Sequence, residues 1–186
     1  MRKALFGVVL LAMGLSLAQG TEYRQAALAA SALARLQALA QTAQGEAKLL
    51  DWAKAVQARA EKDFEAKAYF KAAREAQAAL LLYRAAQGEP QAKAPARPAP
   101  RMGFHHGHGP GPRAWGKEAR ASAPRWAEGA RLAVDRAEKE LAYYRAQDPL
   151  VKDLVAEAKG RLEKEPGRAF LLARAALALI SAERGF

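Results

Sequence analysis

The chain has 186 residues, with 30 lysines and arginines against 19 aspartates and glutamates, and so a formal net charge of +11. It contains no cysteine, which excludes disulfide frameworks, thiolate metal sites and thiol nucleophiles. The length allows one or two small domains.

The N-terminus has the three-part pattern of a secretory signal peptide. Positive charge on Arg2 and Lys3 precedes an apolar run over residues 4–15, and small residues follow at Ala18 and Gly20. The run is about 12 residues long, shorter than the roughly 20 that a membrane-spanning helix needs. We therefore expect a signal segment over residues 1–20, cleaved near Ala18–Gly20. The mature chain would have no transmembrane span and a periplasmic or secreted location.

Two blocks of similar composition follow, separated by a third of different character. Residues 21–87 and 123–186 are rich in Ala, Leu, Glu, Lys and Arg, which are strong helix formers. Residues 88–122 hold six of the nine prolines and all three histidines. Because proline interrupts helices and central strands, we expect a disordered, flexible Pro/Gly/His-rich linker there. The fold class predicted is all-α, with two helical units joined by this linker.

Apolar residues recur at spacings of three and four, which is typical of amphipathic helices. The pattern and its breaks predict helices near 22–43, 46–62, 65–86, 124–146, 149–164 and 167–184. Breaks are expected at Gln44-Gly45, Lys62-Asp63, Gln147-Asp148-Pro149 and Glu165-Pro166-Gly167, with Asp148 capping the helix that Pro149 opens. The apolar stripes contain Phe70, Ala73, Ala76, Gln77, Leu80 and Tyr83; Trp126, Ala130, Ala133, Ala137, Leu141 and Tyr144; and Leu150, Val151, Leu154, Val155, Ala158 and Leu162. The large aromatics are expected in the core, namely Trp52, Phe70, Trp126, Tyr143 and Tyr144.

The two helical blocks match each other. Residues 59–63 (RAEKD) match 161–165 (RLEKE) at an offset of 102, and residues 70–76 match 170–176 at an offset of 100. This indicates an internal duplication of a three-helix antiparallel unit, since a lone helix pair cannot bury its apolar face. The sequence leaves open whether the two units pack together, and in what oligomeric state.

The predicted hairpin resembles the helix-turn-helix units of tetratricopeptide-like repeats. The residues that carry this likeness are Glu61-Lys62-Asp63-Phe64-Glu65-Ala66 and the following Phe70-x-x-Ala73-x-x-Ala76. With the signal segment, the chain is similar to exported bacterial envelope proteins with Ala-rich helical hairpins, a family without an assigned function. The full tetratricopeptide pattern of Trp, Gly, Tyr and Pro is absent. The resemblance implies scaffolding, or binding of another envelope protein, through helical faces.

Three histidines form the sharpest local feature of the predicted linker. His105, His106 and His108 lie among glycines, and neutral imidazole is a common ligand for Zn, Ni and Cu. A metal-binding protein that uses these histidines is therefore an alternative function. The other interpretation is a solvated linker that happens to contain histidine, because no carboxylate lies nearby in the sequence to orient the imidazoles.

Basic residues are densest in the same segment. Lys93, Arg97, Arg101, Arg113, Lys117 and Arg120, with Phe104 and Trp115 among them, could follow an acidic polymer, which gives a second alternative. We expect no specific nucleic-acid binding, and simple solubility is the competing explanation. Phosphate loops, serine elbows and His-Glu helix motifs are absent from the sequence, so we expect a non-catalytic protein.

Overall fold

The computed structural model describes residues 20–88 and 122–185, and all regular structure in these two ranges is α-helical. The first unit consists of α1 (Gly20–Thr42), α2 (Ala47–Glu65) and α3 (Tyr69–Ala86). The second consists of α4 (Ser122–Tyr144), α5 (Pro149–Arg161) and α6 (Pro166–Arg184). The predicted all-α fold of two three-helix units is confirmed. Apart from Gly20, Gly88 and Ser122, the predicted signal segment and linker lie outside the described residues.

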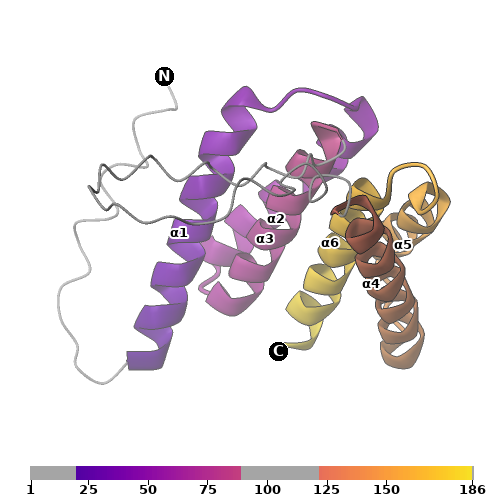
Figure 1. Ribbon diagram of the computed structural model, residues 1–186. Helices are drawn as coiled ribbons and strands as arrows, with labels where there is room; N and C mark the ends of the chain where they lie inside the picture. The colour runs from indigo at the N-terminus through magenta and orange to yellow at the C-terminus, as the bar shows by residue number, and fades with distance from the viewer. Residues whose placement is uncertain (1–19, 89–121, 186) are drawn as a thin grey trace, which may run out of the picture.

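Helices α3 and α6 form the centre of the fold (Figure 1). They pack against each other, α1 and α2 cover α3, and α4 and α5 cover α6. A single apolar core runs through both units and includes Leu36, Leu49, Leu82, Leu172 and Ile180. The two units therefore pack together, which the sequence left open.

Burial repeats between the central helices. Six buried positions of α3 have buried equivalents in α6 at the offset of 100 found in the sequence. The pairs are Ala72 and Leu172, Glu75 and Ala175, Ala76 and Ala176, Ala78 and Ala178, Ala79 and Leu179, and Leu82 and Ala182. The predicted duplication thus extends to the pattern of packing.

Turn and cap residues follow the expected chemistry at the main breaks. Gly45 has φ 143°, in the region that glycine tolerates, and a Cβ there would lie 1.9 Å from the Ala86 carbonyl oxygen. Asp148 caps α5, accepting a hydrogen bond of 2.9 Å from the backbone N–H of Leu150, and Pro149 opens the helix. Pro166 likewise occupies the first turn of α6.

One predicted break was wrong. α2 continues through Lys62 and Asp63 to Glu65, and α3 begins at Tyr69. Lysine and glutamate are good helix formers, so the helix continues past Lys62, and the chain reverses instead at Lys67, where φ is 61°. The other helix ends differ from the expected ones by at most three residues.

The predicted stripes of α4 and α5 are confirmed, since Ala130, Ala133, Ala137, Val151 and Leu154 are all buried. The stripe predicted for α3 was misplaced. Most of its members are half-buried, whereas the fully buried positions include Ala72, Glu75, Ala79 and Leu82. A central helix with neighbours on several sides does not keep the single apolar face of a surface helix.

The expected core aromatics divide into two groups. Trp52, Phe70, Trp126 and Tyr144 are half-buried. Tyr143 is 80% exposed, so its prediction as a core residue was wrong.

Within residues 20–88 and 122–185, none of the helices has the length and apolar character needed to cross a membrane.

Candidate functional site

The boundary between the two units is held by a reciprocal pair of salt bridges. The Arg59 guanidinium in α2 lies 2.7 Å from Asp148, the residue that precedes α5. The Arg161 guanidinium at the end of α5 lies 2.6 Å from Glu46, the residue that precedes α2. At the offset of 102, Arg59 is equivalent to Arg161 and Glu46 is equivalent to Asp148. Each unit thus binds the acidic helix start of the other, as in an interface with two-fold symmetry.

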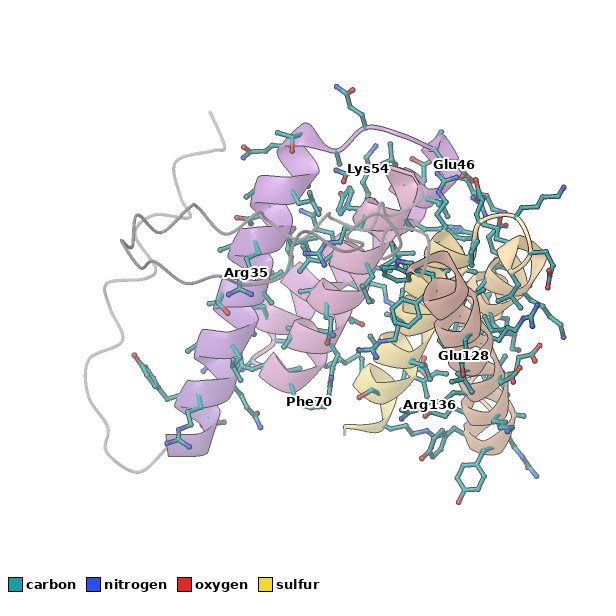
Figure 2. The ribbon with its side chains drawn as sticks, in the orientation of Figure 1. Arg35, Glu46, Lys54, Phe70, Glu128 and Arg136 are labelled. Carbon is teal, nitrogen blue, oxygen red and sulfur yellow. The ribbon has the colours of Figure 1, made fainter. Side chains whose placement is uncertain are left out.

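The second of these contacts is the more extensive. Arg161 binds both carboxylate oxygens of Glu46, at 2.6 and 2.9 Å, and also contacts Glu157 and Glu165 on its own unit. The hydrogen bond from Arg161 to Glu46 raises the pKa of the guanidinium further. Figure 2 labels Glu46 where α2 begins, beside the second unit. Paired fork-to-fork contacts of this kind fix geometry as well as charge.

Arg168 closes the end of α3 from the other unit. Its guanidinium donates to the carbonyl oxygens of Ala85, at 2.8 Å, and Ala86, at 3.3 Å. The last carbonyls of a helix have no partner within the helix and carry partial negative charge, so a cation there satisfies both needs. The start of α6 is thereby fastened to the end of α3, and the two helices run antiparallel (Figure 1).

Beside Arg59 lies a buried carboxylate that the sequence did not reveal. Glu75 of α3 is fully buried, and its Oε1 is 3.5 Å from Arg59 Nε and 3.9 Å from Lys71 Nζ. Neither oxygen accepts a hydrogen bond from the described residues. Asp63 lies nearby and forms a 2.9 Å salt bridge with Lys71.

The environment of this pair favours one bound proton. Burial raises the pKa of Glu75 to about 7, and a hydrogen bond to Asp63 in the protonated form adds to the effect. Burial also acts to raise the pKa of Asp63, but the hydrogen bonds from Lys71 and Glu75 lower it overall. Two close carboxylates titrate as a coupled pair. The pair therefore binds one proton below about pH 7, with the proton favoured on Glu75 and the charge on Asp63.

A cleft of about 440 Å³ opens between α2 and α5. Its lining residues are Lys48, Trp52, Asp153, Ala156, Glu157, Gly160 and Arg161. The Lys48 ammonium lies 4.8 Å from the centre of the Trp52 ring and 2.7 Å from Glu157, and its hydrogen bond lowers the pKa of Glu157. Because Lys48 of α2 and Glu157 of α5 pair across the cleft, this contact holds the two units together.

Large apolar side chains reach the surface on two helices. Among the described residues the exposed ones are Tyr23 (73%), Leu28 (65%), Leu132 (64%) and Tyr143 (80%). All four belong to α1 and α4, which are the first helices of their units. These two helices lie at opposite sides of the fold (Figure 1).

The predicted metal ligands His105, His106 and His108 lie outside the described residues, as do the basic residues proposed to follow an acidic polymer. Within the described ranges, no three His, Cys, Asp or Glu side chains cluster as metal ligands would. Neither the burial of Glu75 nor the salt bridges between the units was predicted from the sequence, although Arg59 and Arg161 occupy matching positions in the two repeats. Comparisons with protein-family models, curated proteins and solved structures gave no match to this chain.

Proposed function

We propose that this chain is a non-catalytic scaffolding protein of the cell envelope, and that it holds a partner protein on the outer faces of α1 and α4. The observation that carries the proposal is that the large exposed apolar side chains of residues 20–88 and 122–185 are confined to these two equivalent helices. Single exposed apolar residues are ordinary, but their concentration on the first helix of each unit points to a binding surface on these two helices.

The face of α4 has a definite chemical character. Leu132, Arg136, Lys139 and Tyr143 follow one another at spacings of four, three and four, so they share one side of the helix. All four are exposed, with apolar side chains at the ends of the row and basic ones between. An amphipathic helix with an acidic centre and apolar flanks would complement this row.

The face of α1 is similar in kind. Arg24, Leu28 and Arg35 are exposed at spacings of four and seven on one side of the helix. Figure 2 labels Arg35 on α1 and Arg136 on α4, at opposite sides of the fold. The scaffold would therefore present two basic and apolar faces pointing apart, and could hold two copies of an acidic helical partner.

The envelope location rests on the N-terminal sequence pattern, with its positive start, short apolar run and small residues before Thr21. Fractionation of cells that express the full chain tests it directly. Recovery of a shortened chain from the envelope or medium supports the proposal. A full-length chain retained in the cytoplasm contradicts it.

The partner faces are tested by photo-crosslinking in cells. A photoreactive residue is placed at Leu28 or Leu132, and in a matched control at Lys152, an exposed position on α5. We expect a discrete protein adduct from positions 28 and 132 but not from 152. The same adduct should weaken with Arg136→Glu, which reverses a charge in the row. Equal labelling at all three positions would rule out these faces as the binding surface.

A second candidate function is metal binding by the predicted histidine cluster. His105, His106 and His108 are the only histidines in the sequence and lie within four residues. Acidic polymers remain a third candidate, through the basic residues of the same segment. Metal binding should respond to pH and polymer binding to salt, so these two conditions distinguish the second candidate from the third.

A further inference from the structure

The contacts between the two units have the form of a dimer interface. Arg59 binds Asp148, and the equivalent Arg161 binds Glu46, so each unit gives and receives the same interaction. The core is continuous across this boundary. These contacts join residues of the helical units themselves. Two units from different chains could therefore form the same contacts.

The connection between the two units is long. Gly88 and Ser122 are separated by the 33 residues 89–121. Fully extended, about 3.3 Å per residue gives such a segment a reach of roughly 100 Å. Helices in compact bundles are usually joined by only about 2–8 residues. The chain is thus long enough for its second unit to leave the first and pair elsewhere.

We propose that a second copy of this chain is a binding partner, through exchange of units. Unit 1 of one copy pairs with unit 2 of the other, by way of the junction formed by Glu46, Arg59, Asp148 and Arg161. An exchanged dimer contains two such junctions for two chains, the same number per chain as in two closed monomers. The contact energy per chain is therefore the same in the closed monomer and in the exchanged dimer. The balance between them depends on protein concentration.

The expected balance follows from the length of the connection. A flexible segment of this length, as its composition predicts, holds the two units at an effective concentration on the order of 1 mM. Closed monomers then dominate at micromolar concentration. Because dimer formation is bimolecular, the dimer share rises in proportion to protein concentration well below this limit.

The absence of cysteine makes this exchange measurable by crosslinking. Lys48 and Glu157 lie across the cleft between the units, 2.7 Å apart, and Lys48 is half-exposed. Two full-chain variants, Lys48→Cys and Glu157→Cys, are unfolded, mixed, refolded together and treated with a short bismaleimide. A crosslink between them requires unit 1 of one chain to meet unit 2 of the other.

Two controls calibrate the result. Lys48→Cys mixed with Leu132→Cys, whose new thiol lies on the outer face of α4, measures random collision. The double variant Lys48→Cys/Glu157→Cys checks that the two positions meet within a closed chain. We expect the test mixture to give at least about ten times more crosslinked dimer than the collision control, and about a tenfold rise in its share from 10 to 100 µM.

Crosslinked dimer at the level of the collision control at every concentration, with efficient internal crosslinking in the double variant, overturns the proposal. So does a dimer share that does not change with concentration. A dimer from Lys48→Cys alone, exceeding that of the mixture, would show that like units pair instead, and it would overturn the specific exchange.

Discussion

Glu75 of α3 and Ala175 of α6 occupy equivalent positions in the two units, and both are fully buried. The second unit shows that this position in the repeat packs well without a carboxyl group. Glu75 instead sits beside Arg59, which reaches across to Asp148 of the other unit. The first unit therefore keeps a titratable group at the junction that the architecture does not require.

Stability should depend on pH through Glu75. Its pKa rises from an ordinary value near 4.5 to about 7, so between these values the folded chain holds a proton that the unfolded chain has released. The contribution of this group to the free energy of unfolding is therefore fully present below about pH 4.5, and it is lost as the pH rises through 7. We expect Glu75→Gln to be more stable than the wild type at pH 8, by about 1–3 kcal/mol. Urea unfolding at pH 5 and pH 8 measures this.

The matched variant in the second unit is Ala175→Gln, which forces the same amide into a fully buried position that alanine now fills, so it should destabilise at both pH values. If Glu75→Gln lowers stability equally at pH 5 and pH 8, the buried carboxyl does not carry the proton.

Removing Arg161 should weaken the fold more than removing an exposed arginine. Arg161 is 16% exposed and binds Glu46, Glu157 and Glu165. Without it, these carboxylates are left to Lys48 and Arg168, which already contact them. We expect Arg161→Ala to cost about 2 kcal/mol, because its short charge-assisted hydrogen bonds are lost. Arg131→Ala breaks only an exposed pair with Glu163 and should cost less than about 1 kcal/mol. Chemical denaturation compares them, and equal losses would show that the junction contact adds no stability.

Two glycines provide an opposed pair of alanine substitutions. At Gly45 a Cβ would collide with the backbone of Ala86 and φ is positive, so Gly45→Ala should destabilise by more than about 1 kcal/mol. Gly160 lies within α5, where a Cβ meets open space. There alanine should stabilise by roughly 0.5 kcal/mol. Thermal melting measures both, and a neutral Gly45→Ala would mean that the turn can move away from Ala86.

Metal titration of the full chain tests the histidine prediction. If His105, His106 and His108 bind Zn, Ni or Cu, affinity should fall as the pH drops below about 6, where imidazole protonates. A variant with all three changed to alanine should lose the binding heat in calorimetry. Binding to an acidic polymer should instead weaken steeply with added salt. Heat that survives the triple substitution would assign the metal to other residues.

Local sequence predicted those parts of the fold that depend on neighbours along the chain. The cap at Asp148, the prolines that open α5 and α6, and the apolar stripe of α4 each follow from a few adjacent residues. The end of α2 was misplaced because Lys62 and Asp63 break nothing by themselves. The reversal depends on backbone geometry at Lys67.

The junction could not be predicted in the same way. Its contacts join residues 89 positions apart, for Arg59 and Asp148, and 115 apart, for Glu46 and Arg161. In the sequence Glu75 resembles an ordinary exposed helical glutamate. It is buried because other helices pack against α3. The duplication did contain the needed signal, because an interface between repeats brings equivalent residues together in pairs. The prediction of Tyr143 as a core residue was wrong for a local reason. It neighbours Tyr144 of the apolar stripe, but its own side chain points to another side of the helix.

The backbone N–H of Glu46 donates a 3.1 Å hydrogen bond to the Ala86 carbonyl, the same group that Arg168 reaches from α6. Two residues further on, at Gly88, the chain leaves the first unit. Tension applied to the chain beyond this point would bear on that carbonyl, and through it on the Glu46 backbone and on Arg168. Mechanical load would thus be shared by both units, through the Glu46 backbone in the first and through Arg168 in the second.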